Sequence, residues 1–140
     1  MQLLTTAVTY RNRIGFVPKS CPERTRKDRI IEALGAANIP KVHDEPLSRY
    51  YKYLTEHLCF PFLAHFPKPL NLEEEDEFRC TVLDLLDPEE YMGDGFDGIF
   101  SKTSKGKYEI NLPLIDLYLP EDSFGFQLID DYWYWFWNWR

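Results

Sequence analysis

Cysteine is scarce in this chain of 140 residues, and its pattern excludes two kinds of small domain. The three cysteines, Cys21, Cys59 and Cys80, are an odd number, and no two of them form a CxxC pair. A disulfide scaffold needs paired cysteines and a zinc knuckle needs closely spaced ones, so neither is expected. A reducing compartment is the simplest setting for such thiols, and we expect a cytoplasmic protein.

Long apolar runs and the common catalytic motifs are also absent. No stretch approaches the ~18 apolar residues of a membrane span, and the N-terminus lacks the basic and apolar regions of a secretory signal. The chain contains no HExxH, GxSxG, GxxxxGK[ST] or GxGxxG motif. A pair of Cys59 with His57 or His65 stays open as an enzymatic alternative, although sequence-adjacent groups on a helix and a strand seldom align. We expect a protein that is not an enzyme.

Positive charge is in deficit overall and unevenly distributed. The net charge of -7 disfavours nucleic acid as a partner, because phosphate groups bind basic surfaces. Residues 1–43 contain eight Lys or Arg against three acidic residues, whereas residues 44–140 contain eight against twenty. We expect a basic N-terminal extension with one short helix (1–43) and an acidic domain (44–140). The extension could bind an acidic protein partner or its own acidic neighbour.

Two helices are predicted in the first half of the chain. Ser20 and Glu23 have the spacing of a capping box, which predicts a short helix that ends at Gly35. Ser48 can cap a second helix over residues 46–58, since aromatic and leucine side chains recur along one face of it before Pro61.

Short apolar runs broken by turn residues follow from residue 60 and predict strands. Residues 103–106 separate two of these runs, and Gly106 can supply the positive φ of a hairpin turn. The expected class is α+β, with four to five short strands in a small, antiparallel, curled sheet or barrel and with flanking helices.

The aromatic C-terminal segment gives conflicting signals. Trp recurs at every second residue in 133–139, which favours a strand. Leu128, Tyr132, Trp135 and Trp139 also fall on one face of a helix, so periodicity alone leaves helix and strand open.

The acidic residues concentrate around one glycine-rich segment between predicted strands, residues 87–98, which we call the acidic loop. Calcium takes six to eight oxygen ligands on a flexible backbone, and such a loop can supply carboxylate and carbonyl oxygens together. The spacing is not that of an EF-hand, because counting from Asp94 places Phe96 and Gly98 at the third and fifth positions and Lys105 at the twelfth. Composition alone also fits a hydrated acidic surface.

Several segments, in the same order, resemble the CcbP-type calcium-binding proteins of cyanobacteria. Residues 49–62, RYYKYLTEHLCFPF, resemble the aromatic helix of that family, which ends in FPF. The strand EFRCTVLDLL, the acidic loop, the step LPLIDL (112–117) and the terminal segment DYWYW (131–135) follow as they do in the family. The resemblance covers about residues 48–137 and implies an SH3-like curled sheet, flanking helices and a helical C-terminal segment.

What the resemblance implies for function is calcium binding without catalysis, as a buffer or signalling component. The implied ligands are the acid on the aromatic helix and those of the loop: Glu56, Asp87, Glu89, Glu90, Asp94 and Asp97. The alternative is a protein–protein interaction module with an acidic docking surface and a basic N-terminal arm, which exposure of Trp133, Trp137 or Trp139 would favour. Neither hypothesis involves nucleic acid or a membrane.

Overall fold

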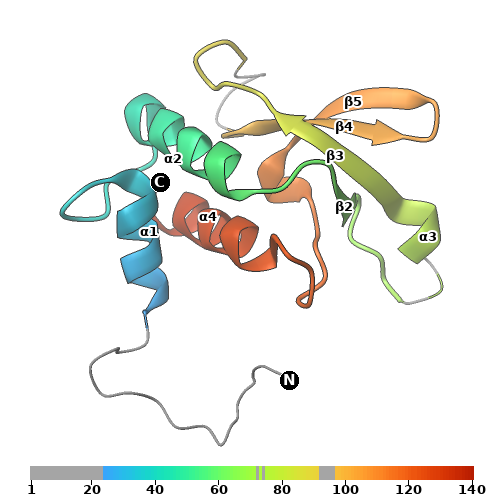
Figure 1. Ribbon diagram of the computed structural model, residues 1–140, viewed down its shortest axis with the longest axis horizontal. Helices are drawn as coiled ribbons and strands as arrows, with labels where there is room; N and C mark the ends of the chain where they lie inside the picture. Colours follow the sequence, from blue (N-terminus) through green and yellow to red (C-terminus); the bar gives the residue numbers. More distant parts are fainter. Residues whose placement is uncertain (1–23, 72, 74, 92–96) are drawn as a thin grey trace, which may run out of the picture.

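The computed structural model describes residues 24–71, 73, 75–91 and 97–140, and it has the predicted α+β class (Figure 1). Two helices precede the strands of one antiparallel sheet, and a further helix follows them. In chain order they are α1 (Arg26–Leu34), α2 (Asp44–His57), β2 (Phe62–His65), α3 (Glu75–Phe78), β3 (Arg79–Leu85), β4 (Phe100–Lys105), β5 (Tyr108–Pro113), the 3-10 helix η2 (Leu114–Asp116) and α4 (Phe126–Asn138). No helix in these described ranges is both long and apolar enough to cross a membrane.

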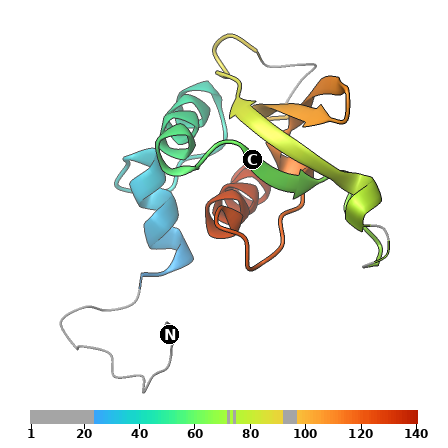
Figure 2. The same cartoon turned by 45° about the vertical axis from the view of Figure 1, so that its right-hand side comes forward.

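The sheet is open rather than closed into a barrel. Its four strands lie in the order β2-β3-β4-β5, and each pair of neighbours is antiparallel. Helices α2 and α4 lie on one side of the sheet (Figures 1 and 2), so burial of that face does not require β5 to return to β2. The outer edge of β2 meets Tyr118 instead, through an isolated bridge to His65. The predicted SH3-like barrel is therefore not confirmed.

Both predicted N-terminal helices form, but each begins at a different residue from the predicted one. Thr25 caps α1, because its hydroxyl accepts a hydrogen bond from the Asp28 N–H at 3.1 Å while the Asp28 carboxylate accepts one from the Thr25 N–H. The predicted capping box of Ser20 and Glu23 lies outside the described residues, and α1 begins later than predicted, whereas the end at Gly35 (φ +61°) is confirmed. Helix α2 begins at Asp44, so Ser48 lies inside it and is not its cap.

The predicted hairpin is confirmed as β4 and β5, and its turn is shorter than the predicted one over residues 103–106. Lys105 pairs with Tyr108, which leaves Gly106 and Lys107 as the turn, and Gly106 has the expected positive φ of +59°. Residues 103–105 belong to β4 and not to the turn. The two-residue connection arises because glycine adopts the left-handed conformation such turns need at little cost.

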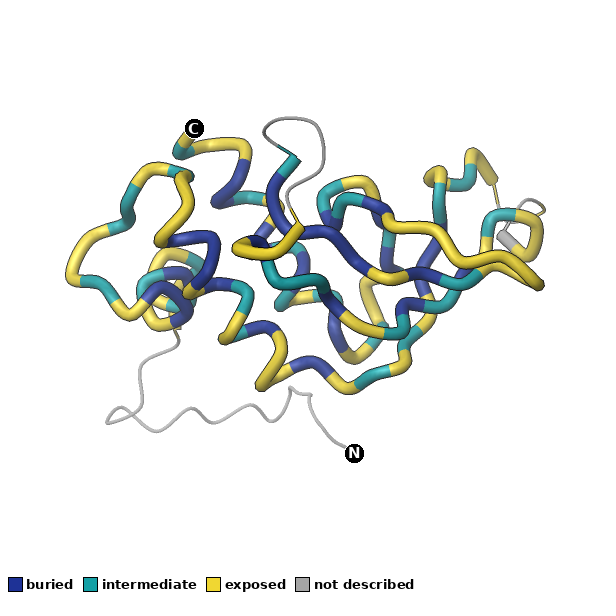
Figure 3. Tube along the Cα trace, turned by 90° about the horizontal axis from the view of Figure 1, so that it is seen from above, coloured by how far each residue is buried: buried dark blue, intermediate teal, exposed yellow. Residues whose placement is uncertain are grey.

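The aromatic C-terminal segment is the helix α4 and forms the centre of the core. Tyr132 and Trp135 are fully buried, and the Tyr50 ring of α2 lies 5.2 Å and 5.3 Å from theirs. Figure 3 shows that the buried residues gather in the middle of the molecule. The helical choice for this segment is thus confirmed, because the helix buries one aromatic face against α2 and the sheet.

The end of α4 is tied to the chain that precedes α2. The indole Nε1 of Trp135 donates a hydrogen bond to the Pro40 carbonyl at 2.9 Å. The Val42 N–H donates to the Trp139 carbonyl at 2.7 Å. We call these two bonds the terminal clasp, since they join the beginning and the end of the segment that contains the sheet.

Helix α1 packs on the outside of the helix layer and shares its core. Ile30 and Leu34 are fully buried, and α1 contacts both α2 and α4. Three arginines on or just before α1 pair within the chain: Arg24 with Glu32, Arg26 with Asp130 and Arg29 with Asp131. The positive charge of residues 24–35 therefore neutralises acidic neighbours in the same molecule. The division of the chain at residue 43 stays a prediction.

Candidate metal centre

A β-bulge at the end of β3 sets the direction of the first carboxylate. Strands β3 and β4 lose their regular register between Val82 and Asp84. Because of this shift Asp84 is exposed while Leu85 is buried, and Asp84 lies opposite Lys102. The Asp84 carboxylate accepts a hydrogen bond from the Leu85 N–H at 2.8 Å. The strand therefore delivers an acidic side chain to the beginning of the acidic loop.

The first part of the acidic loop is a turn organised by Asp87. The Asp87 carboxylate accepts a hydrogen bond from the Glu89 N–H at 2.9 Å, as in an Asx turn, and its carbonyl accepts bonds from the N–H groups of Glu90 and Tyr91. Pro88 is buried below the turn, whereas Glu89 and Glu90 are exposed. The turn therefore fixes the backbone of Glu89 and Glu90 and leaves both side chains exposed.

Helix α2 offers hydroxyl groups to this turn. The Ser48 hydroxyl donates a hydrogen bond to Glu89 Oε2 at 2.8 Å, across 41 positions of sequence. Burial raises the pKa of the Tyr51 hydroxyl, and the carboxylates of Asp87, Asp84 and Glu90 raise it further, in part offset by a hydrogen bond with Thr55. Several negative charges thus lie within electrostatic range of one phenol.

A second pair of acids lies where the loop returns to the sheet. Burial raises the pKa of Asp116, in η2, and the neighbouring charge of Asp97 raises it further. Both causes disfavour the ionised carboxylate of Asp116, and a bound cation would oppose them. Asp97 is half-buried and directly precedes Gly98, which is buried against α4.

The structure brings some of the six sequence-predicted ligands together and separates others. Asp87, Glu89 and Glu90 share one turn beside α2. Asp97 lies beside Asp116 at the other end of the loop, and Asp94 lies outside the described residues. Glu56 is exposed on α2, and its spacing from Tyr51 and Thr55 places it ~100° or more around the helix from them.

No metal-binding group is already assembled within the ranges that the structure describes. No three side chains of His, Cys, Asp or Glu there come close enough to hold an ion together. Carboxylates that share a turn repel one another, so a wider arrangement is expected for their unneutralised state.

Sequence reasoning missed three groups near these acids. Asp84 belongs to a strand and could be assigned to the exposed side only by knowing the bulge. Asp116 lies within electrostatic range of Asp97, which no sequence spacing indicates. Ser48 was expected to cap α2, and the location of a serine inside a helix gives no sign that it binds a distant carboxylate.

The enzymatic alternative predicts a pocket that joins a histidine with Cys59. A pocket does contain Cys59 and His65, but both ring nitrogens of His65 are buried without a hydrogen-bond partner in the described part of the chain. His57 instead lies on α2, where Nδ1 donates to the Tyr53 carbonyl at 2.8 Å and the two rings stack. Neither histidine makes the hydrogen bond through which a base activates a cysteine nucleophile.

Comparison with known proteins gives one family and one similar structure. A model of the CcbP family, described as calcium binding, matches residues 40–136. The crystal structure of CcbP from Anabaena has a similar fold, with a TM-score of 0.55 and 23% sequence identity, and the match covers 81% of this chain and 92% of that chain. At this identity the likeness concerns the fold alone. A search of curated proteins found no match.

Proposed function

Because this chain belongs to the CcbP family of calcium-binding proteins, we propose that it holds the ion at the acidic loop after β3, without an EF-hand and without catalysis. Calcium is the ion that the family binds. The proposal assigns the binding to the turn of Asp87, Glu89 and Glu90, together with Asp84 at the end of β3.

The observation that carries this proposal is the environment of Tyr51. The charges of Asp87, Asp84 and Glu90 all raise the pKa of its hydroxyl, after the larger effect of burial, so these carboxylates lie within electrostatic range of one side chain of α2. Calcium takes carboxylate, carbonyl and hydroxyl or water oxygens at ~2.3–2.6 Å, and it tolerates irregular geometry. An ion among these groups would relieve their mutual repulsion and would draw them closer together.

The remaining sequence-predicted ligands have unequal support. Asp97 lies at the returning end of the same loop, where its charge and that of Asp116 are close enough to interact. Asp94 stays a prediction from its position between Asp87 and Asp97 in the sequence. Glu56 has the weakest support, since its side of α2 differs from the one that faces the turn.

We further propose a buffer or signalling role in the cytoplasm. An irregular site of few carboxylates is consistent with dissociation constants of ~10⁻⁷ to 10⁻⁴ M, the range of sensors and weaker sites. The free thiols of Cys59 and Cys80 support a reducing compartment. Burial raises the pKa of Cys80, so this thiol is protonated at neutral pH and has a structural role.

Replacing two acids of the turn tests the proposed site. The double variant Asp87→Asn with Glu90→Gln keeps the shape of both side chains and removes two negative charges. We expect its calcium dissociation constant to rise at least tenfold, because each carboxylate is a direct or near ligand. Isothermal calorimetry with Ca²⁺, and separately with Mg²⁺, measures this change.

A matched variant separates ligand loss from loss of overall charge. Glu73→Gln with Glu77→Gln removes the same number of charges from two exposed side chains that lie before β3. We expect its calcium affinity to stay within about twofold of that of the parent, since exposed charges at a distance are screened. Equal losses in both variants would show that net charge, and not the turn, governs binding.

One observation favours the interaction module as a second candidate. Trp133 and Trp137 lie one helical turn apart on α4 and are 45% and 47% exposed, so they form an apolar surface available to a partner. The arginines of α1, by contrast, pair within the chain, which weakens the idea of a basic arm for an acidic partner. Absence of calorimetric heat and of a melting shift at millimolar Ca²⁺ would leave this candidate as the better one.

A further inference from the structure

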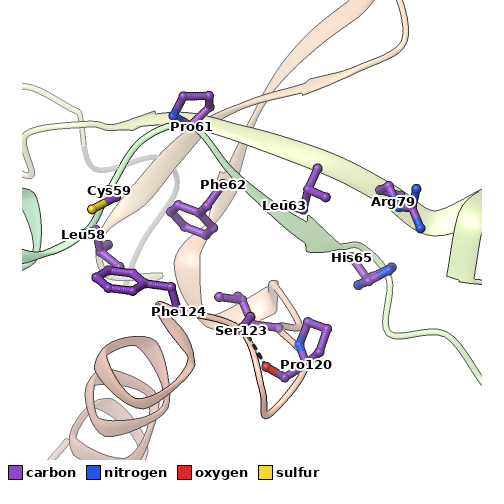
Figure 4. Close-up of a pocket in the computed structure, with 12 residues that line it drawn as sticks. Leu58, Cys59, Pro61, Phe62, Leu63, His65, Arg79, Pro120, Ser123 and Phe124 are labelled. Atoms are coloured by element: carbon purple, nitrogen blue, oxygen red, sulfur yellow. Dashed lines mark hydrogen bonds between the residues drawn. The ribbon is translucent and has the colours of Figure 1, made fainter. Parts of the chain in front are cut away.

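A pocket between β2 and the segment before α4 lies apart from the acidic loop. Its volume is about 480 Å³, which is within the range of small-molecule sites. The walls are mostly apolar and include Leu58, Phe62, Leu119 and Phe124. Figure 4 shows Leu58, Cys59 and Phe124 at one end of the pocket and His65 and Arg79 at the other. The pocket is therefore apolar at one end and polar at the other.

The histidine at the polar end of the pocket is buried, and its ring makes no hydrogen bond with the described residues. His65 is only 5% exposed, and neither of its ring nitrogens has a hydrogen-bond partner within the described residues. Its backbone is fixed, because its N–H and carbonyl both bond to Tyr118, at 2.8 Å and 2.9 Å. Buried polar groups in proteins are nearly always paired, so an unpaired imidazole beside a pocket indicates a group that a ligand can satisfy.

The charge at the polar end of the pocket determines which kind of ligand group can bind there. Arg79 lies directly opposite His65 in the β2–β3 register, and it forms an ion pair with the exposed Asp76. Surface pairs of this kind are weak, and a guanidinium has further donors available for a second acceptor. Among the residues that the structure describes, no acidic one lines the pocket, although the chain has a net charge of -7. The pocket thus favours an anion and not a cation.

We propose that this pocket binds a small amphipathic carboxylic acid. The apolar tail occupies the end lined by Leu58 and Phe124, and the carboxylate lies toward His65 and Arg79. The imidazole donates a hydrogen bond to the carboxylate, and the guanidinium supplies the opposing charge. Binding is independent of calcium, since none of the described residues of the acidic loop lines the pocket.

Titration with decanoate tests the proposal, in calcium-free buffer and below the concentration at which decanoate forms micelles. We expect saturable one-to-one binding in calorimetry and a higher melting temperature for the bound protein. Decan-1-ol, which has the same chain without the charge, is expected to bind at least fivefold more weakly. Absence of saturable decanoate binding, or equal binding of the alcohol, would overturn the proposal.

Three variants locate the binding. His65→Leu removes the imidazole and Arg79→Gln removes the charge, and each is expected to weaken decanoate binding at least fivefold. Phe124→Asp places an acid at the apolar end on a side chain that is already 74% exposed, so the fold is retained while binding is lost. The control Tyr108→Ser changes an exposed aromatic group on the β4–β5 hairpin and is expected to leave the affinity unchanged. Decanoate binding that survives Phe124→Asp, or falls equally in Tyr108→Ser, would place the ligand elsewhere and refute the assignment.

Discussion

Replacing Gly98 with alanine is expected to destabilise the protein by about 3 kcal/mol. Gly98 has φ +73°, a conformation that costs an alanine ~1–2 kcal/mol. An added Cβ would also lie 2.4 Å from the Tyr132 hydroxyl and 2.8 Å from Phe136 Cε1, both of which belong to fully buried side chains. The clash displaces the Tyr132 hydroxyl, which accepts a hydrogen bond from the Ile99 N–H at 2.9 Å. Urea-induced unfolding measures the loss.

Gly106→Ala is the matched control for this substitution. Gly106 also has a positive φ, +59°, but no atom lies within 4 Å of the position of its Cβ. The variant should therefore lose only the conformational part, ~1–2 kcal/mol. Similar losses at the two glycines would mean that α4 moves aside easily and that close packing does not constrain Gly98.

Asp131→Ala is expected to cost about 3 kcal/mol, because it leaves the Arg29 guanidinium without its main partner. Asp131 is buried in α4, and the Nε and Nη2 atoms of Arg29 donate to its two carboxylate oxygens at 2.7 Å and 3.1 Å. The hydrogen bond and the charge of Asp131 raise the pKa of Arg29, against the effect of burial. The pair joins α1 to α4, so denaturation curves should show its loss clearly.

The neighbouring Asp130 provides a control with similar chemistry and more solvent. It pairs with Arg26 at 2.6 Å, but both side chains are about one third exposed. Asp130→Ala should therefore cost no more than ~1 kcal/mol. If both aspartates cost the same, burial does not determine the strength of the Arg29 pair. The double variant Arg29→Met with Asp131→Leu should recover much of the loss, since no unpaired charge remains.

The sequence predicted those helices and turns that depend on residues close together in the chain. Gly106 predicted the hairpin because its turn needs a positive φ, and the spacing of Tyr50 and Leu54 predicted α2 because one helical face is buried. The C-terminal helix was different, since alternating tryptophans also suit a strand. For this segment the resemblance to a family decided between helix and strand. The physical reason for the helix is that it packs Tyr132 and Trp135 against Tyr50.

Features that depend on distant contacts were not predictable from spacing. Ser48 lies near the start of α2 and has the residue type of a cap, but its hydroxyl binds Glu89. The bulge after Val82 changes which side chains of β3 face the solvent, and it depends on pairing with β4. Closure of the sheet depends on whether helices cover its face, which a count of strands does not reveal. Sequence reasoning thus selected acidic side chains of one loop as candidate ligands, but it did not foresee the distant partners of those side chains.

The terminal clasp gives the fold a nearly circular path. The bonds from Trp135 to Pro40 and from Val42 to Trp139 bring the two limits of the sheet-containing segment together, close to residues 40 and 136, where the family match begins and ends. A unit whose limits meet in this way has a single attachment point for whatever precedes or follows it. New ends could be opened in an exposed turn such as Gly106 and Lys107 while a short linker joins the old ones, giving a circular permutant with the same core.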